Sequence, residues 1–559
     1  MDFREELIKI LKKVIKEEFS GFIEIPPDKN LGDFALPCFF LAKKLKKSPH
    51  QIAQELKDKI KLNEAFEKIE SVGPYLNFFV NKKYFVKEVL SEILKKKDKY
   101  GAQKQRKKVM VESPGPNTNK PLHLGHVRNI LLAKGYCGTM RFLGNKVTQV
   151  DIINDRGIHI MKSILAYKKF GKNEKPKIKG DHFVGKYYIL YNKKLKENPS
   201  LEKEAKELLR KWEQDDKETI KIWKLMNSWA LKGIRETYKK FNLKIDKTYY
   251  ESETYQAGKQ MVFDGCKKGL FKEDSDGSIY INLDKDLGKK VLLRNDGTSL
   301  YITQDLYVAR KRFQEYKGLD LCVYVVASEQ DYHFKVLFKL LELLKVKGAG
   351  KCYHLSYGLV NLPEGKLKSR EGTTVDADNL LDEMINLAKR ELDKRVKLDK
   401  VEKEKRAKEI AISALTFFLL KQDTFKDILF DPNESISFEG DTGPYVQYTY
   451  ARASSILKKA KLNKKINYNL LEEPIEYGLI KKLSLFGEIV LNSGNNYNPS
   501  FLVRYLIELS HTFNEFYHLC NVLKSEKDLM VARLAIVSAT KQVLSNGLKI
   551  LDLKPLEEM

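Results

Sequence analysis

The sequence predicts a multidomain α/β protein in which a doubly wound parallel sheet stands between an N-terminal α+β domain and a C-terminal all-α helical bundle. The chain has 559 residues, and a single hydrophobic core stops growing near ~250–300 residues, so about three domains are expected. Between about 105 and 435, strand and helix patterns alternate, as such a sheet requires. From Glu439 to Met559 only helical apolar spacing remains, which predicts the bundle.

The N-terminal domain is expected to span residues 1–98. Residues 5 to 18 place apolar side chains at helical spacing. Ser48, Pro49 and Gln51 supply an N-cap, a first-turn proline and a capping-box partner for a second helix. The segment Tyr75 to Val80 is strand-like, and the basic, glycine-containing stretch from Lys95 to Lys108 is typical of a linker.

The central domain is expected to span residues 99–437 and to contain a helical insertion near 168–245. Its candidate strands are Val109–Glu112, Val147–Ile153, Leu321–Ala327 and Tyr353–Val360. The insertion is rich in Lys and Glu between Lys168 and Lys224, which indicates solvated helices. In the C-terminal domain, 438–559, the apolar spacing predicts helices over Leu479–Leu491, Leu502–Phe516 and Leu534–Leu551.

The charge of the chain indicates a polyanionic partner. Lys and Arg number 102 against 75 Asp and Glu, which gives a formal net charge of +27. Nucleic acid is the leading partner for such a surface. The alternative is a lysine-rich proteome in which many surfaces are basic, and charge alone does not decide between the two.

Cysteine usage and hydropathy indicate a cytoplasmic protein. The six cysteines form no C-x-x-C pair and have no histidine at ligand spacing, which argues against a disulfide framework and a structural zinc site. The N-terminus is charged from the start, and no stretch reaches ~18 uninterrupted apolar residues, so neither a signal peptide nor a membrane span is expected.

The most informative segment runs from Glu112 to His126, between the first strand of the central domain and the helical pattern Val127–Leu143. A strand-to-helix turn is where open α/β sheets bind nucleotides, because the helix N-terminus offers unpaired N–H groups and a positive dipole end. Gly125 lets a flat base approach the backbone, and His123 and His126 are potential phosphate donors. By itself, a pair of histidines near a turn is more often merely solvated.

A second segment, Gly365 to Gly372, forms a glycine-bounded basic loop after the fourth candidate strand. Together, the two segments resemble the His-Ile-Gly-His and Lys-Met-Ser-Lys-Ser signatures of class I aminoacyl-tRNA synthetases, which have a Rossmann-like catalytic domain. The segments Asp296–Asp305, 440–452 and Arg533–Met559 are similar to those of the arginyl-tRNA synthetase family, and the resemblance covers nearly the whole chain.

The resemblance implies an arginine–tRNA ligase. Such an enzyme activates arginine with ATP to arginyl-adenylate and transfers it to the 3′ end of tRNA(Arg), releasing AMP and pyrophosphate. Mg²⁺ would accompany ATP, and no dedicated protein metal site is expected. The implied partners are tRNA(Arg) and arginine, without a membrane, and the expected state is a monomer.

The resemblance also implies roles for particular residues. The second loop lacks the usual second lysine and has Ser369 there, so the neutralising charge at the α-phosphate passes to Lys120. The catalytic candidates are Lys120, His123, His126, Lys366, Lys368 and Arg370, and the ATP-binding candidates are His123, Gly125, His126, Lys366 and Leu367. The arginine-binding candidates are Glu112, Asn117, Tyr301, Asp305 and Gln330. The tRNA-binding candidates are Phe34, Tyr75, Asn77, Phe79, Tyr445, Tyr448, Arg452 and Met559.

Several ordinary structural roles compete with these. Lys120 is a solvent-exposed loop lysine if the motif stands alone, and Asp305 has Arg310 or Arg294 as an alternative ion-pair partner. The aromatic candidates for tRNA contact are also common core residues. Two departures from the family pattern, Arg156 and His159, put the shape of the pocket in question.

Two other functions compete with the ligase. One is another class I synthetase or a small nucleotidyltransferase of the same fold. The other is a basic RNA-binding scaffold with a degenerate nucleotide site, which Ser369 and Glu371 favour.

Overall fold

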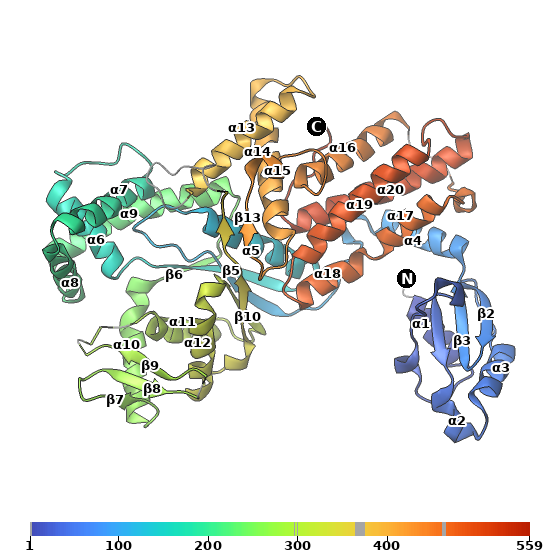
Figure 1. Cartoon of the computed structure of the whole chain (residues 1–559), viewed down its shortest axis with the longest axis horizontal. Helices are drawn as coiled ribbons and strands as arrows, with labels where there is room; N and C mark the ends of the chain where they lie inside the picture. Colours follow the sequence, from blue (N-terminus) through green and yellow to red (C-terminus); the bar gives the residue numbers. More distant parts are fainter. Residues whose placement is uncertain (1–2, 285, 296, 299, 364–374, 461–464) are drawn as a thin grey trace.

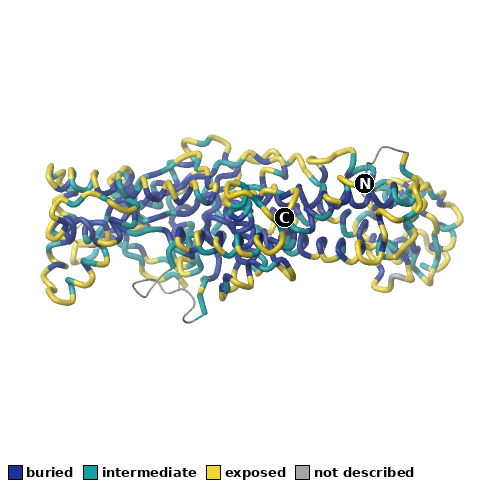
Figure 2. The backbone as a smooth tube through the Cα atoms, turned by 90° about the horizontal axis from the view of Figure 1, so that it is seen from above, coloured by how far each residue is buried: buried dark blue, intermediate teal, exposed yellow. Residues whose placement is uncertain are grey.

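The computed structural model describes residues 3–284, 286–295, 297–298, 300–363, 375–460 and 465–559. The molecule is elongated, with the N-terminal unit at one end and the insertion helices at the other (Figure 1). Buried backbone runs along the length of the molecule, and exposed backbone lines its rim (Figure 2). Among the described residues, no helix combines the length and the apolar character needed to cross a membrane.

The N-terminal unit is a three-stranded antiparallel sheet with three helices. Its elements are α1 (Phe3–Leu11), β1 (Phe34–Pro37), α2 (Phe39–Leu45), α3 (Pro49–Lys59), β2 (Phe66–Val72) and β3 (Tyr75–Val80), in the sheet order β1-β3-β2. The predicted capping box is present, since Ser48 and Gln51 bond each other's backbone N–H. The helix predicted over residues 5–18 is too long, because α1 ends at Leu11. Ile15 and Phe19 follow it in an irregular segment and are nevertheless buried, so the apolar spacing there reflects burial and not a helix.

Helix α4 (Lys82–Lys96) follows this unit, but its buried residues pack against the C-terminal helices. Its buried residues Val86, Val89, Leu90 and Ile93 share a core with the C-terminal helices α17 (Pro474–Ser484) and α20 (Lys527–Ile550). Asn546 on α20 donates hydrogen bonds to the carbonyls of Lys97 and Tyr100 in the segment that follows α4. The chain is therefore fixed to the C-terminal helices before it enters the catalytic sheet.

The central sheet confirms the doubly wound fold. Its five parallel strands are β4 (Lys108–Glu112), β5 (Lys146–Ile153), β6 (Lys247–Tyr250), β10 (Leu321–Ala327) and β11 (Cys352–Tyr357). The sheet order is β11-β10-β4-β5-β6, so the first strand lies in the middle and the connections leave it in opposite directions. A crevice is expected at the carboxyl ends of β4 and β10, where the order reverses.

Helices cover both faces of this sheet. Val109 and Val111 of β4 pack into the core of α5 (Leu124–Phe142), α13 (Ala377–Asp393) and α14 (Lys400–Leu420). Met110, between them, faces the core of α10 (Glu251–Lys267), α11 (Tyr301–Glu315) and α12 (Asp331–Leu343). The continuous apolar run of β4 thus reflects burial on both faces.

Several parts of the central region differ from expectation. The expected strand Tyr353–Val360 is two strands, β11 and β12 (Val360–Asn361), and β12 pairs with β13 (Ile428–Leu429). Strand β6 and a small antiparallel sheet went unpredicted because their segments are too short to carry a clear apolar pattern. That sheet consists of β7 (Lys272–Glu273), β8 (Ile279–Asn282) and β9 (Lys289–Leu293).

The insertion is helical, as predicted, but it is more than a solvated arm. It contains α6 (Ile158–Phe170), α7 (Gly180–Glu197), α8 (Ser200–Glu213) and α9 (Lys217–Lys240). Phe183, Tyr187, Tyr191 and Trp212 are buried in its own core. The many Lys and Glu residues hid these aromatic positions, whose spacing is helical.

The C-terminal region is all-α across its described residues, 439–460 and 465–559. After α15 (Pro432–Ser435), it contains α16 (Gly443–Lys459), α17, α18 (Phe486–Asn495), α19 (Ser500–Leu519) and α20. The single helix expected over Leu479–Leu491 is two helices that meet at Leu485. The other two predicted helices lie within α19 and α20.

Candidate functional site

The histidine motif lies at the N-terminus of α5, at the carboxyl end of β4. His123 is the N-cap residue, and its backbone N–H donates to Nδ1 of His126 over 3.2 Å. The two rings lie 4.0 Å apart between centroids, and both side chains are half-buried rather than freely solvated. A Cβ on Gly125 would lie 3.1 Å from the His123 ring, so the missing side chain leaves room beside it.

Both histidines are neutral at ordinary pH. Burial lowers the pKa of His123 to about 4, and it lowers the pKa of His126 well below the usual value. The positive charge of Lys120, three residues before His123 in the chain, lowers both pKa values further. Neutral imidazoles donate hydrogen bonds without adding charge.

Lys120 is half-buried, unlike an ordinary loop lysine. Burial lowers the pKa of its ammonium group. The loop that carries it packs against α7, since a Cβ on Gly185 would lie 2.9 Å from Cδ of Pro121 and 3.6 Å from Cα of Lys120. This cation is therefore held beside the histidines by surrounding structure.

The residues that follow the second signature, Val375 to Ala377, are hydrogen-bonded to the histidine motif. The Leu124 N–H donates to the Val375 carbonyl, and the Ala377 N–H donates to the Leu122 carbonyl, each over 2.9 Å. Asp376 is thereby the bridge partner of His123. The candidates Lys366, Leu367, Lys368 and Arg370, with Ser369 and Glu371, lie outside the described residues.

Carboxylates gather next to this edge of the sheet. Glu112 ends β4, and Asp305 lies on the first turns of α11, where Tyr301 occupies the same face one turn earlier. Burial raises the pKa of Glu112, Arg312 opposes this effect, and the charge of Asp305 adds to it. Arg312 forms an ion pair with Glu112.

Asp305 pairs with neither arginine considered from sequence. Instead, Nε2 of His333 lies 2.7 Å from its Oδ2 atom. The Asp305 side chain keeps 29% of its surface exposed, so one side of the carboxylate remains accessible. Tyr301 is also exposed, at 55%.

Glu251 belongs to the same group, although sequence reasoning missed it. It is the first residue of α10, only 3% exposed, and burial raises its pKa to about 7. Its Oε1 atom accepts from Gln304 over 2.6 Å, while Oε2 is buried without a hydrogen-bond partner among the described residues. Nothing near Glu251 in the sequence marks it, because its partners Gln304 and Arg156 lie about 50 and about 95 residues away.

The two departures from the family pattern face the insertion. Arg156 contacts Glu213 on α8 at 2.5 Å, lies 3.7 Å from Glu251, and places its guanidinium 4.2 Å from the centre of the Tyr255 ring. Nδ1 of His159 lies 3.1 Å from the Tyr188 hydroxyl. Arg156 therefore ties the edge of the pocket to α8 and α10.

The two remaining arginine-binding candidates lie at the carboxyl edge of the sheet. Asn117 is half-buried and forms a parallel bridge with Asn154, just beyond β5. Gln330 is exposed at the end of a short 3₁₀ helix, Ser328–Gln330, directly after β10. The five candidates thus come from the ends of β4 and β10, from the loop after β4, and from α11.

Behind the sheet, Asp151 supports the active-site loop. This buried residue of β5 accepts from the Gly115 N–H over 3.0 Å and from the Tyr238 hydroxyl of α9 over 2.6 Å. Burial raises its pKa to about 7. Sequence reasoning missed Asp151, which lies in β5 among other polar residues such as Thr148 and Gln149.

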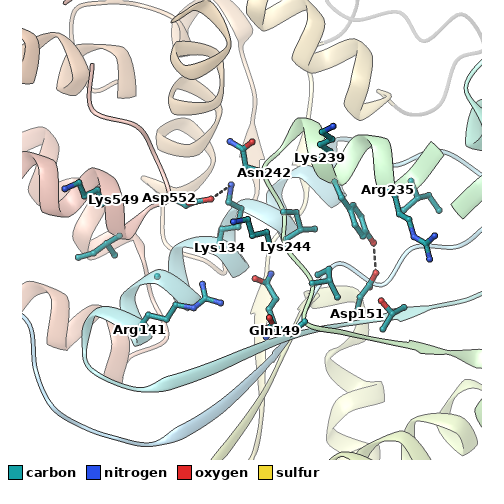
Figure 3. A pocket seen from close by; sticks show the side chains of 18 of the residues that line it. Lys134, Arg141, Gln149, Asp151, Arg235, Lys239, Asn242, Lys244, Lys549 and Asp552 are labelled. Atoms are coloured by element: carbon teal, nitrogen blue, oxygen red, sulfur yellow. Dashed lines mark hydrogen bonds and ion pairs between the residues drawn. The ribbon is translucent and has the colours of Figure 1, made fainter. Parts of the chain in front are cut away.

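A cavity of about 1180 Å³ lies beside Asp151, between β5, α5, α9 and the end of α20 (Figure 3). Its lining includes six cationic side chains (Lys134, Arg141, Arg235, Lys239, Lys244 and Lys549) and four carboxylates (Asp98, Asp151, Asp246 and Asp552). Some of these pair directly, as Lys134 does with Asp552 at 2.8 Å. None of the candidate residues lines this cavity, so it is distinct from the active-site edge.

Tyr445, Tyr448 and Arg452 share one face of α16, as their spacing predicts. The Tyr448 ring lies 4.9 Å from the Arg452 guanidinium, and Arg452 bonds Asn514 of α19 at 2.5 Å. Tyr517 of α19, which is 40% exposed, lies 5.1 Å from the same guanidinium. The result is a half-buried patch of aromatic rings and one arginine, in which Asn514 and Tyr517 were not foreseen.

The N-terminal candidates are divided between two faces of their sheet. Tyr75, Asn77 and Phe79 alternate with core residues of β3 and so share the outer face. Phe34 lies opposite Phe78 and packs against the core, on the other face. Asn77 is only 2% exposed. At the C-terminus, Met559 packs against the main core.

Three family models match successive parts of the chain. The arginyl tRNA synthetase N-terminal domain matches residues 1–80, the class I (R) tRNA synthetase catalytic domain matches 89–432, and the DALR anticodon binding domain matches 446–559. The chain belongs to the arginyl-tRNA synthetase family. This membership excludes the alternative of a different class I synthetase.

Relatives match over nearly their whole length. The arginine–tRNA ligase of Treponema denticola is 44% identical, over 98% of this chain and 96% of that protein. The solved arginyl-tRNA synthetase of Thermus thermophilus has a TM-score of 0.80 and 27% identity, covering 100% of this chain and 99% of that one. The Plasmodium falciparum arginyl-tRNA synthetase has a TM-score of 0.78 at 21% identity over the same shares, a likeness of fold.

Proposed function

We propose that the chain carries out the arginine–tRNA ligase reaction at the carboxyl edge of β4 and β10. Arginine, ATP and tRNA(Arg) give arginyl-tRNA, AMP and pyrophosphate. The observation that carries the proposal is the juxtaposition of two unlike groups at this edge. Lys120, His123 and His126 offer donors for phosphate, and Glu112, Glu251 and Asp305 offer acceptors for a guanidinium.

In the first step, a carboxylate oxygen of arginine attacks the α-phosphate of ATP and pyrophosphate leaves. No protein nucleophile is needed, so the protein holds two anions in line and neutralises the charge that builds on the phosphate oxygens. His123 and His126, neutral in this structure, donate hydrogen bonds to the phosphates. Lys120 supplies the positive charge at the α-phosphate. Lys366, Lys368 and Arg370 are proposed to act on the leaving pyrophosphate, and Leu367 to contact ATP.

Arginine recognition rests on the carboxylates. A guanidinium offers five donors in a planar fork, and a carboxylate accepts two of them in parallel. Asp305 has an accessible side, and Oε2 of Glu251 lacks a hydrogen-bond partner among the described residues. Tyr301, Asn117 and Gln330 are proposed to contact the remaining polar groups of the amino acid.

Mg²⁺ is proposed to arrive with ATP as its counterion. The chain does bring Asp181, His182 and Asp378 within 4.8 Å of one another, which is metal-ligand geometry. Lys179 and Lys240 already contact the Asp378 carboxylate, at 2.7 and 3.1 Å. One ammonium group lies at each oxygen of this carboxylate, and these two positive charges disfavour a divalent cation there.

For tRNA, we propose two contact surfaces. The aromatic patch of α16 and α19 suits stacking of splayed anticodon bases. On the N-terminal sheet, Tyr75 and Phe79 are the half-buried members of the outer face, and the ammonium of Lys68 lies 4.9 Å from the Phe79 ring. Phe34 and Met559 pack against cores, which leaves their tRNA contacts without support from the geometry.

We further propose that the enzyme acts in the cytoplasm as a monomer. Six free cysteines, four of them buried, are consistent with a reducing compartment.

Aminoacylation of tRNA(Arg) with arginine, lysine and citrulline tests the proposal. Citrulline has nearly the shape of arginine but no charge, so it leaves the pocket carboxylates unpaired. We expect efficient charging with arginine alone. Failure to charge arginine, or equal charging of citrulline, would overturn the proposed site.

A further inference from the structure

A half-buried ion-pair cluster joins the insertion to the residues that follow the second signature. Lys179 and His182, at the start of α7, face Asp376 and Asp378, at the start of α13. Nζ of Lys179 lies 2.7 Å from Asp378, while Nε2 of His182 lies 3.2 Å from Asp376 and 3.5 Å from Asp378. About 195 residues separate the two helices in the sequence.

Other groups complete the cluster and balance its charge. Asp181 lies 2.8 Å from Lys179, Lys240 of α9 lies 3.1 Å from Asp378, and the Thr237 hydroxyl lies 3.1 Å from Asp378. Three carboxylates therefore meet two ammonium groups and one imidazole. The nearby carboxylates raise the pKa of His182 to about 10, so the imidazole is cationic at neutral pH.

Asp376 connects the cluster to the catalytic motif. Its Oδ1 atom caps α13, accepting from the Asp378 and Asn379 N–H groups over 2.9 and 3.0 Å, and its Oδ2 atom faces His182. Its backbone is the bridge partner of His123. A shift of Asp376 would therefore move the backbone segment that is hydrogen-bonded to the turn carrying His123.

The same face of α7 touches the Lys120 loop. His182 and Gly185 are three residues apart and so lie on one side of the helix. Gly185 makes the close approach to Pro121 and Lys120 described above. Helix α7 is itself fixed to α9, since a Cβ on Gly180 would lie only 2.0 Å from the Trp229 carbonyl oxygen.

We propose that α7 braces the ATP end of the active site: His182 through Asp376, and Gly185 through Pro121, hold His123 and Lys120 in their relative positions. His182 and Asp376 are thus positioning residues that touch no substrate. This inference rests on the roles proposed for Lys120 and His123, and it assigns the charged insertion a part in the first chemical step.

The test compares His182→Gln, Asp376→Asn and the double variant. Asn still caps a helix, so Asp376→Asn removes the charge but keeps the cap. Lys186→Ala is the matched control, because Lys186 lies on α7 but pairs with Glu174 on an exposed surface. Arginine-dependent ATP–pyrophosphate exchange is measured with tRNA(Arg) present, and kcat is normalised to the fraction of protein that binds tRNA.

We expect each single variant to lower the normalised kcat about 10- to 100-fold, because small misplacements of catalytic groups have effects of this size. The KM for arginine should stay within about 2-fold. The double variant should be no worse than the poorer single variant, since both changes break one contact. Lys186→Ala should behave as wild type.

Two results would overturn the brace. One is a normalised kcat near wild type in both single variants, which would mean that the substitutions lower only the amount of folded protein. The other is a double variant whose fold-losses multiply. The proposed function fails separately: in that case the wild-type enzyme shows no arginine-dependent exchange, or Lys120→Ala exchanges as well as wild type.

Discussion

Lys120 is the residue on which the proposed chemistry of the first step depends most. Its half-buried ammonium lies beside His123 and His126, and burial lowers its pKa. A desolvated cation stabilises developing phosphate charge more strongly than a solvated one, because water screens it less.

Lys120→Ala should lower the rate of arginine activation by about 10²–10³-fold, as loss of one electrostatic donor does. Arginine binding should change little, because the charge is needed mainly as pyrophosphate leaves. Single-turnover kinetics separates the two effects. Near-normal turnover in Lys120→Ala, together with loss of turnover in Lys368→Ala, would show that the assignment of the missing lysine is wrong.

Asp305→Asn should raise the KM for arginine about 10- to 100-fold, with ATP binding unchanged. The substitution keeps the shape but removes a charge, and a hydrogen bond to a charged group contributes about 1.5–3 kcal/mol. Because 29% of the side chain is exposed, an effect larger than this is not expected. Calorimetric titration with arginine checks the change, and an unaltered affinity would assign Asp305 a structural role with His333.

Asp151→Asn should change how stability depends on pH. The amide can still accept from Gly115 and donate to Tyr238, so the geometry is retained. In the wild type, burial raises the pKa of Asp151 to about 7, so the folded state binds the proton more tightly than the unfolded state. Wild-type stability is therefore lost as pH rises from about 4 to about 7, and the variant escapes this loss.

Scanning calorimetry of both proteins between pH 5 and 8.5 measures the effect of Asp151→Asn. The stability of the variant relative to wild type should rise by at most about 1.4 kcal/mol per pH unit up to about pH 7 and then level off. A difference that is independent of pH would mean that Asp151 ionises normally in the folded protein.

At the scale of elements, the aromatic patch between α16 and α19 is the proposed anticodon surface. Tyr448→Ala should weaken tRNA(Arg) binding by about 1–3 kcal/mol, the value of one lost stack. The half-buried Tyr448 ring packs at the edge of the main core, so melting should be checked alongside filter binding. An unchanged dissociation constant in a folded variant would place the anticodon elsewhere.

An element can be predicted from sequence when the residues that determine it lie within the element itself. Strands β4 and β10 are continuous apolar runs, and helix α5 has helical apolar spacing. Strand β5 mixes apolar and polar residues, and all four elements were predicted close to their bounds. Strands β6, β7, β8 and β9 are too short to carry a clear apolar pattern, and β6 pairs with β5, which lies about 100 residues earlier in the sequence.

The same distinction holds for the candidate site. His123, His126 and Lys120 stand in one contiguous motif. Glu251 and Asp151 lack a local signature, because burial against other elements sets their chemistry. The contact between His182 and Asp376 joins segments about 195 residues apart, and no pattern within either segment predicts it.

At the scale of the whole molecule, the C-terminal helices lie between the N-terminal unit and the central sheet, so both surfaces proposed for tRNA belong to the same side of that sheet (Figure 1). Helix α20 links these regions, since it bonds the segment after α4 and packs against α5 at Gly138, where a Cβ would lie 1.8 Å from the Ile550 carbonyl oxygen. Binding of tRNA at the C-terminal helices is therefore mechanically connected to the helix that carries His123.

Arginine-dependent ATP–pyrophosphate exchange, measured with and without tRNA(Arg), tests the central claim most directly. Because α20 connects the proposed anticodon surface to α5, we propose that bound tRNA completes the arrangement of the catalytic groups. We therefore expect exchange to be nearly silent with arginine and ATP alone. Saturating tRNA(Arg) should restore it, and other amino acids should not support it. Robust exchange without tRNA would contradict this coupling, and exchange that does not depend on arginine would contradict the proposed site itself.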